Sequence, residues 1–364
     1  KDINRQFMLK NGFDRYGCFF NQDQSAKVLI EKNCHDLVEG KRNLVLYGDS
    51  EAMDVVLAEG FICILKSPAT LSQQILEVCD LVESDDVVIL DFVHSLTLSQ
   101  CVDIPELLKE WRNNAKAIAL LDGVNRQGLA TICDKLDIDL LLVPYAGSEG
   151  NSAGCVEHTC AGAKFAILPP IYQNQKNRQC RLQADRVMVT CGGSDAKGVT
   201  GKILKALDLV ESNLEIQIIV GPMFHPAQIE NLEMLKQESH HKVTLIFSPP
   251  SLVSYMIWCD IAVATNGLTK YELAATGTPA VLLSIDDAHE EANLGFSKQK
   301  TTLCLGIVYN VTREKISKSV NDLLLDYPQR KVMAINGQKL IDGKGVSRVV
   351  ENIMSLKSQT IMSI

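Results

Sequence analysis

Short apolar runs recur along the chain and alternate with longer segments that have the apolar periodicity of amphipathic helices. The apolar runs lie at residues 43–47, 61–65, 86–90, 117–121, 139–143, 187–191, 215–220, 242–247, 259–265, 280–285 and 301–309. Continuous apolar runs of this length are typical of strands that are buried on both faces of a parallel sheet. Their alternation with helices predicts an α/β protein with two doubly wound parallel sheets.

A polar, proline-led segment interrupts this alternation at residues 169–186. Its sequence, PPIYQNQKNRQCRLQADR, follows neither the strand period nor the helix period, which favours a linker. We therefore predict one domain at residues 1–168 and a second domain at residues 187–364, with the ligand-binding edges of the two sheets facing each other across a cleft.

The stretch ATNGLTKYELAATGTPAVLL, residues 264–283, reads as a strand end, a short helix and a further strand. Thr269 is a candidate N-cap of the helix, and Gly277 lies where a left-handed C-terminal cap would fall. Asn266, Gly267, Thr269 and Glu272 gather near the carboxyl end of the first strand, where open α/β sheets bind ligands. Two interpretations remain open: a ligand site, or a structural crossover in which Glu272 only favours the helix dipole.

A glycine-rich turn follows the strand at residues 187–191. Its residues are Gly192, Gly193, Ser194 and Asp195, and a helix begins near Val199. Glycines let a ligand approach the backbone closely, and amides at a helix start can receive phosphate oxygens. The turn matches neither the dinucleotide fingerprint nor the Walker sequence, and a plain structural turn is the alternative interpretation.

Composition narrows the functional class. The chain has 364 residues, 46% hydrophobic and 22% charged, with a formal net charge of −8. No run of Lys and Arg suggests a nucleic acid partner, and no apolar stretch is long enough for a transmembrane segment. The twelve cysteines form no Cys-x-x-Cys pair, so we expect buried reduced thiols in a cytoplasmic protein. The chain begins with Lys1, and we recognise no secretion signal in it.

Three motifs resemble, in order and spacing, those of a known group of nucleotide-sugar enzymes. They are VTCGGSD at residues 189–195, IIVGPMF at 218–224 and CDIAVATNGLTKYELAATGTPAVLL at 259–283, and GAKFAILPPIY at 162–172 is similar to the group's interdomain segment. From about residue 86 onward the chain resembles the UDP-sugar hydrolase of pseudaminic acid biosynthesis and its relatives in spore-coat polysaccharide biosynthesis. More distantly, the second half resembles the N-acetylglucosaminyl transferase that makes lipid II.

This resemblance implies a GT-B fold, in which two Rossmann-like domains face a cleft and the last helices return to the first domain. It implies that Glu272 accepts hydrogen bonds from the ribose of a UDP-sugar. The amides around Asn266 to Thr269 and around Gly192 to Ser194 would face the diphosphate. His289 and Glu290 would lie near the donor sugar, and the resemblance implies neither a metal nor a cofactor.

The chain departs from the group in its first half. The group opens with a Gly-x-Gly-His turn whose histidine is tied to catalysis, and the nearest counterpart here is RYGCFFNQ at residues 15–22. This segment keeps Gly17 but has Asn21 and no histidine, which argues against simple hydrolysis. The interdomain segment also has Pro169 and Ile171 where the group usually has an arginine and an acid.

Three residues of the first domain are candidates for catalysis. Asp91 ends a predicted buried strand and His94 follows three residues later, so either side chain is a candidate base for an attacking hydroxyl. Asp122, at the end of the next strand, is a candidate for positioning the acceptor. The alternatives are a surface histidine at His94 and a helix N-cap at Asp91.

Three functional classes follow from these observations. The first is a glycosyltransferase that uses a UDP-sugar donor, the second is a UDP-sugar hydrolase, and the third is a nucleotide-sugar-binding protein without catalysis. The acceptor, whether water, a sugar or a glycan, is not specified by the sequence. The missing histidine favours the first and third classes over the second.

Overall fold

The computed structural model describes residues 17–20, 26–31, 42–47, 62–66, 87–91, 104–114, 117–121, 137–149 and 158–359 except 174, 176, 177 and 266. The chain divides into two compact units. The second unit contains Pro170–Gly343, and the first unit contains Asn4–Pro169 together with Lys344–Ile364. The last helix of the chain therefore belongs to the first unit.

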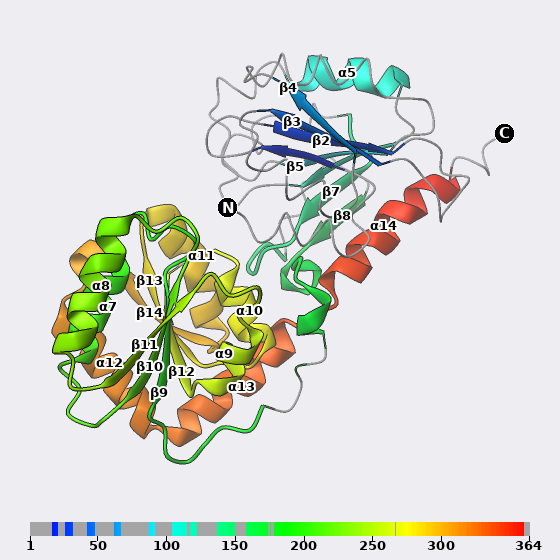
Figure 1. Ribbon diagram of the computed structural model, residues 1–364. Helices are drawn as coiled ribbons and strands as arrows, with labels where there is room; N and C mark the ends of the chain where they lie inside the picture. The colour runs from blue at the N-terminus through cyan, green and yellow to red at the C-terminus, as the bar shows by residue number, and fades with distance from the viewer. Residues whose placement is uncertain are drawn as a thin grey trace. The chain divides into compact units, whose positions relative to one another are not determined.

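The second unit is built on a six-stranded sheet with the order β11-β10-β9-β12-β13-β14 (Figure 1). Every pair of neighbouring strands in it is parallel, as the apolar runs predict. The strands are β9 (Arg186–Thr190), β10 (Glu215–Val220), β11 (Lys242–Phe247), β12 (Ile261–Ala264), β13 (Ala280–Ser284) and β14 (Thr302–Ile307). Because the order reverses between β9 and β12, this edge is the switch point at which such sheets bind ligands.

Helices cover both faces of this sheet. They are α7 (Val199–Leu207), α8 (Pro226–Glu238), α9 (Val253–Trp258), α10 (Thr269–Ala275), α11 (Asp287–Lys298), α12 (Arg313–Leu325) and α13 (Tyr327–Leu340). Figure 1 shows α7, α8 and α12 together on one face, while α10 packs against α13 on the other. Local sequence sets the helix starts: Thr312 caps α12 through the amide of Lys315, and Asp326 caps α13 through the amide of Gln329.

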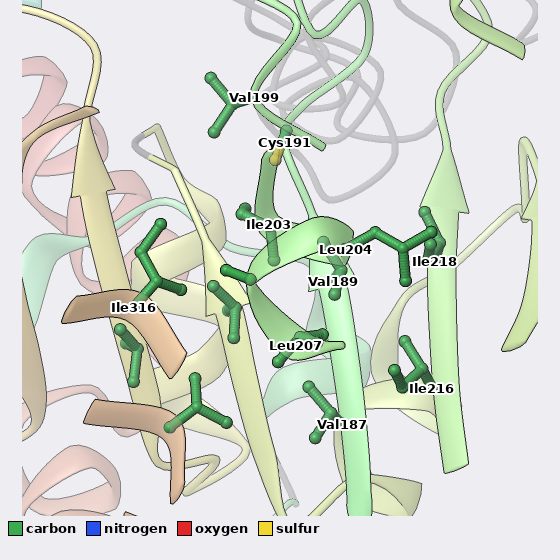
Figure 2. Packing of buried hydrophobic residues seen from close by; sticks show 14 of the residues in the cluster. Val187, Val189, Cys191, Val199, Ile203, Leu204, Leu207, Ile216, Ile218 and Ile316 are labelled. Carbon is green, nitrogen blue, oxygen red and sulfur yellow. The ribbon is translucent and has the colours of Figure 1, made fainter. Parts of the chain in front are cut away.

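The core of the second unit lies between the sheet and α7, α8 and α12. Figure 2 shows Val187 and Val189 of β9 beside Ile203 and Leu207 of α7. All four side chains are fully buried, because the strand residues face an apolar helix stripe. Nearby Cys191 is also buried, as the sequence predicts.

The first unit contains an eight-stranded sheet with the order β4-β3-β2-β1-β5-β6-β7-β8. Its strands are β1 (Gly17–Phe20), β2 (Ala26–Glu31), β3 (Arg42–Tyr47), β4 (Ile62–Lys66), β5 (Val87–Asp91), β6 (Ala117–Leu121), β7 (Leu140–Val143) and β8 (His158–Ala161). The pairs β1–β2 and β2–β3 are antiparallel, so the expectation of a wholly parallel first sheet is wrong. The remaining pairs are parallel, as predicted.

The first unit also contains α5 (Ile104–Asn114), the short 3-10 helix η2 (Ala163–Phe165) and the last helix, α14 (Gly345–Gln359). Gly345 lies so close to Ala166 that a Cβ atom at residue 345 would be 2.0 Å from the Ala166 carbonyl oxygen. The start of α14 is thus fixed directly against the segment that follows η2. Among the described residues, no helix has both the length and the apolar character needed to cross a bilayer.

Candidate functional site

The glycine turn after β9 lies at the carboxyl edge of the second sheet. Gly192 has a φ of 78°, a conformation that favours glycine. A Cβ atom on Gly221 would lie 2.3 Å from the carbonyl oxygen of Gly193, and the Met223 amide donates a 2.9 Å hydrogen bond to the same oxygen. The end of β10 therefore fixes the backbone of the turn.

Asp195 uses its carboxylate within this turn. Its two oxygens accept hydrogen bonds from the amides of Val199, at 2.7 Å, and Thr200, at 2.9 Å. Burial raises the pKa of Asp195, although these same hydrogen bonds act in the opposite direction. The first-turn amides that the sequence offers to phosphate oxygens thus already donate to Asp195.

A second turn lies beside the first, because β12 and β9 are neighbours and Ala264 pairs with Thr190. Gly267 has a φ of 95°, and Thr269 is the first residue of α10. The expectation that Thr269 is the N-cap is wrong: Leu268 holds that position with helical dihedral angles and without a side-chain cap. Asn266 lies outside the described residues. Gly277 ends the helix with a φ of 65°, which confirms the predicted left-handed cap.

Glu272 is a buried carboxylate on α10. Its side chain is 6% exposed, and its Oε1 atom accepts a 2.9 Å hydrogen bond from the phenol of Tyr172. Burial raises the pKa of Glu272 to about 7, and the Tyr172 bond limits this rise. Tyr172 is itself buried, in the 3-10 helix η3 (Pro170–Tyr172). A solvated carboxylate that only favours the helix dipole would not be enclosed in this way.

Lys270, which the sequence analysis did not select, lies two residues before Glu272. Its side chain is 4% exposed, and Nζ donates a 3.2 Å hydrogen bond to Oδ1 of Asn293 on α11. Asn293 in turn donates to the hydroxyl of Ser284, at the end of β13. Burial lowers the pKa of Lys270 to about 8. Among the described residues no carboxylate contributes to the electrostatics of Lys270, and no pattern in the sequence marks it.

The start of α11 lies at the same edge, because β13 is the neighbour of β12. The Asp286 carboxylate accepts hydrogen bonds from the backbone amide of His289, at 2.9 Å, and from its Nδ1 atom, at 2.5 Å. Burial acts to raise the pKa of Asp286, but the contacts with His289 bring it below its ordinary value. Glu290, one residue on, is partly exposed and lies near Gly306. The structure thus gathers the predicted second-domain residues that it describes at one sheet edge.

The catalytic candidates are described only in part. Asp91 is the last residue of β5, where its backbone pairs with Leu121 of β6 and with Phe19 of β1. His94 and Asp122 lie outside the described residues. Gly17 lies within strand β1, so the comparison of RYGCFFNQ with a turn after the first strand is wrong at this position.

One group of side chains in the described part of the chain has metal-ligand chemistry: Asp208, His240 and His241. His241 Nδ1 accepts a 3.3 Å hydrogen bond from the Leu214 amide, and Nε2 lies 2.8 Å from the Leu207 carbonyl oxygen. Both nitrogens of this buried histidine are therefore used by the backbone. The group is better explained as a fixed core histidine than as a metal site.

Comparison with known proteins identifies a relative in sequence and several solved structures with the same fold. No known family model matches the chain. It is similar to the spore coat polysaccharide biosynthesis protein SpsG of Bacillus subtilis, with 26% identity over 207 residues, 55% of this chain and 59% of the relative. The chain thus spans less than two thirds of the length of that relative. This similarity agrees with the resemblance to the spore-coat group.

Three solved structures share the fold. Acinetobacter baumannii MurG is 16% identical, with a TM-score of 0.52 over 83% of this chain and 93% of MurG. A Staphylococcus aureus MnaA–UDP co-structure is 16% identical, with a TM-score of 0.54 over 85% and 94%. The calicheamicin glycosyltransferase CalG4 is 12% identical, with a TM-score of 0.55 over 86% and 90%. The chain has the two-domain α/β fold of the GT-B proteins, as predicted.

Proposed function

We propose that this chain binds a UDP-sugar and transfers its sugar in the biosynthesis of a cell-surface glycan. The second unit holds the nucleotide at the edge formed by the turns after β9 and β12. Glu272 accepts hydrogen bonds from the ribose, and the backbone of Gly192 to Ser194, Gly267 and Thr269 faces the diphosphate. His289 and Glu290 lie on the side of the donor sugar.

The observation that carries this proposal is the enclosure of Glu272. A buried carboxylate costs free energy unless hydrogen bonds compensate it, and Oε1 has the single phenol of Tyr172 as its hydrogen-bond donor. A ribose offers two adjacent hydroxyl groups. One carboxylate can accept a charge-assisted hydrogen bond from each of them. The site lies at the switch point of the sheet, where nucleotides bind in open α/β folds.

The comparisons support the same function. The relative SpsG is named for spore coat polysaccharide biosynthesis, and a solved neighbour with 85% coverage of this chain contains UDP. A further neighbour is a glycosyltransferase. The buried free thiols of Cys191 and Cys259 fit a protein that works in the reducing cytoplasm.

On the acceptor side, Asp91 or His94 takes the proton from the attacking hydroxyl, and Asp122 positions the acceptor. The alternative function is hydrolysis of a UDP-sugar, as in the pseudaminic acid pathway, with water as the acceptor. A second alternative is nucleotide-sugar binding without chemistry. Both alternatives keep the site at Glu272 and differ only in what the first unit does.

Calorimetry tests nucleotide binding. We expect UDP and UDP-sugars to bind more tightly than ATP or NAD. Gly193→Val should abolish binding, because the change adds bulk where the diphosphate would lie; the circular dichroism spectrum of the variant checks that the fold is preserved. Unchanged UDP affinity in this variant would show that the glycine turn is only structural.

Product analysis separates the three functional classes. The protein is incubated with radiolabelled UDP-sugars, with and without candidate glycan acceptors. Label in a glycan supports transfer, free sugar released without an acceptor supports hydrolysis, and neither product supports a binding protein. The variant Asp91→Asn should lower product formation while UDP binding, on the other unit, stays unchanged.

A further inference from the structure

The side chain that bonds Glu272 comes from residues 170–175, here called the connecting segment, with which the second unit begins after the chain leaves the first. The chain passes between the units at Pro169–Pro170 and again at Gly343–Lys344. Tyr172 follows the first passage by two residues, and its phenol reaches Oε1 of Glu272 at 2.9 Å. The proposed ribose-binding carboxylate is therefore bonded directly to the start of the connecting segment.

The second passage is packed on the first. Gly343 has a φ of 74°, and a Cβ atom there would lie 2.6 Å from the carbonyl oxygen of Tyr172 and 2.7 Å from Cα of Gln173. The backbone at residues 172–173 and at residue 343 therefore cannot move independently.

The helices α10 and α13 are also in close backbone contact. Gly337 of α13 lies against Ala274 of α10, where a Cβ atom would be 2.9 Å from the Ala274 carbonyl oxygen. The side-chain amide of Gln338, one residue on, donates from Nε2 to the carbonyl oxygen of Gln175. Glu272, the connecting segment and α13 thus form one packed group inside the second unit.

Tyr172 and a ribose compete for the same acceptor. Glu272 is 6% exposed and Tyr172 is 3% exposed, so the phenol covers the carboxylate oxygen that it bonds. Each carboxylate oxygen can accept two hydrogen bonds, so the competition is for space: the buried phenol occupies the approach to Oε1 that a ribose hydroxyl needs. When a ribose displaces the phenol, the hydrogen bond from the phenol to Glu272 is broken and one from the ribose is formed. The carboxylate still accepts a hydrogen bond, while the phenol of Tyr172 has lost its acceptor.

We propose that Tyr172 is a displaceable cover of Glu272, and that the ribose of the donor replaces its phenol and thereby loosens the segment that connects the two units. This inference rests on the proposed function and adds a coupling between nucleotide binding and the interdomain connection. Tyr172 acts through Glu272 and through Gly343, and it does not itself touch the reacting atoms.

The variant Tyr172→Phe tests the competition. It keeps the buried ring and removes the oxygen that competes with the ribose, so UDP should bind roughly threefold to tenfold more tightly, the effect of losing one hydrogen bond to a charged acceptor after partial compensation. Tyr255→Phe on α9 is the matched control, because it removes a phenol oxygen elsewhere in the same unit, and it should leave the affinity unchanged. Both are measured by calorimetry on the full chain.

Hydrogen exchange tests the loosening. The Gln173 amide, directly after η3, donates a 2.9 Å hydrogen bond to the Pro170 carbonyl oxygen. Saturating UDP should accelerate exchange of this amide in the wild-type chain, although ligands normally slow exchange near their site. The amide of Thr276, which bonds the Glu272 carbonyl oxygen at 3.0 Å, should not accelerate.

The outcomes separate this inference from the proposed function. Tighter binding in Tyr172→Phe together with faster exchange at Gln173 supports it. If wild type binds UDP and Glu272→Gln weakens binding, while Tyr172→Phe binds equally or less tightly, then Tyr172 is no cover and only the inference fails. If wild type does not bind UDP, the proposed function and the inference both fail.

Discussion

The ammonium group of Lys270 donates a 3.2 Å hydrogen bond to the amide oxygen of Asn293, and both side chains are almost completely buried. The Nζ atom also lies 5.6 Å from the centre of the Phe296 ring. A neutral amide and an aromatic face offset only part of the free-energy cost of burying a cation. Lys270 therefore carries an uncompensated cost, at the sheet edge where the proposed anionic ligand binds.

The variant Lys270→Met should stabilise the fold near neutral pH. The pKa of Lys270 is lowered by burial from 10.5 to about 8, so the folded state binds fewer protons than the unfolded state between these values. Stability of the wild type should rise with pH across that window, and the full cost, at most about 3 kcal/mol, is present below pH 8. Urea unfolding at pH 7 and pH 10 measures it.

Lys300→Met, on an exposed side chain after α11, is the control and should change the stability little at either pH. If Lys270→Met instead lowers the stability at pH 7, then the packing of the aliphatic part of the lysine contributes more than its buried charge costs. A loss of UDP affinity in Lys270→Met alone would further show that the ammonium contributes to the anionic site.

The variant Asp195→Ala should destabilise the second unit. It removes the acceptor of the Val199 and Thr200 amides at the start of α7, and it leaves alanine at a φ of 41°. Loss of such a cap costs about 1 to 2 kcal/mol. Asp195→Asn keeps one acceptor and tolerates this φ, so it should cost less. Thermal melts of the two variants give the ranking.

The UDP affinity of Asp195→Asn tests whether Asp195 contacts the nucleotide or only caps α7. If the carboxylate serves only α7, the affinity is unchanged while the melting temperature falls. A fall in affinity without a fall in melting temperature would instead place Asp195 in contact with the nucleotide.

The second sheet was predictable because burial on both faces leaves continuous apolar runs. β10 and β11 begin and end at the residues expected from the sequence, and Gly277 has the expected left-handed conformation. The antiparallel pairing of β1 and β2 was not predictable in this way. Strand direction depends on which neighbours pair, and a short apolar run is the same in both directions.

The site was predictable only as positions along the chain. Glycines and polar residues after β9 and β12 indicated which edge of the sheet binds a ligand. They did not indicate which side chains and amides already form hydrogen bonds within the fold. The assignment of Asp195 to the α7 amides and of Tyr172 to Glu272 depends on backbone geometry and on residues separated by 100 positions. Thr269 failed as an N-cap because Leu268 already has helical dihedral angles.

Arg330 should be required for the stability of the second unit. It is a fully buried cation on α13, and its guanidinium donates to the carbonyl oxygens of Leu323, Leu324, Arg181 and Leu182. Arg330→Met removes the donor and leaves these carbonyl groups without it, which should cost about 3 kcal/mol. Lys331→Met, on the exposed neighbour, is the control for urea unfolding. Equal midpoints for the two variants would contradict a structural role of Arg330.

The variant Glu272→Gln should change nucleotide affinity and stability in opposite directions. Burial raises the pKa of Glu272 from 4.5 to about 7, so the folded state binds more protons than the unfolded state between these values. Stability of the wild type should therefore fall as pH rises from about 4.5 to about 7, by at most about 3 kcal/mol. Glutamine carries no charge and still accepts from Tyr172, so the variant should lack this loss and be more stable than wild type at pH 8.

Affinity for a UDP-sugar should fall in the same variant by about 1.5 to 3 kcal/mol, because a charged acceptor of the ribose hydroxyls is lost. A UDP-sugar is the better probe than UDP, since its diphosphate does not titrate near neutral pH. Wild-type affinity should rise as Glu272 ionises through about pH 7, and the variant should show no such rise. Calorimetry and urea unfolding of both proteins at pH 5.5 and pH 8 measure the two quantities. A stability loss at pH 8 with unchanged affinity would remove Glu272 from the nucleotide site and return it to a structural role in α10.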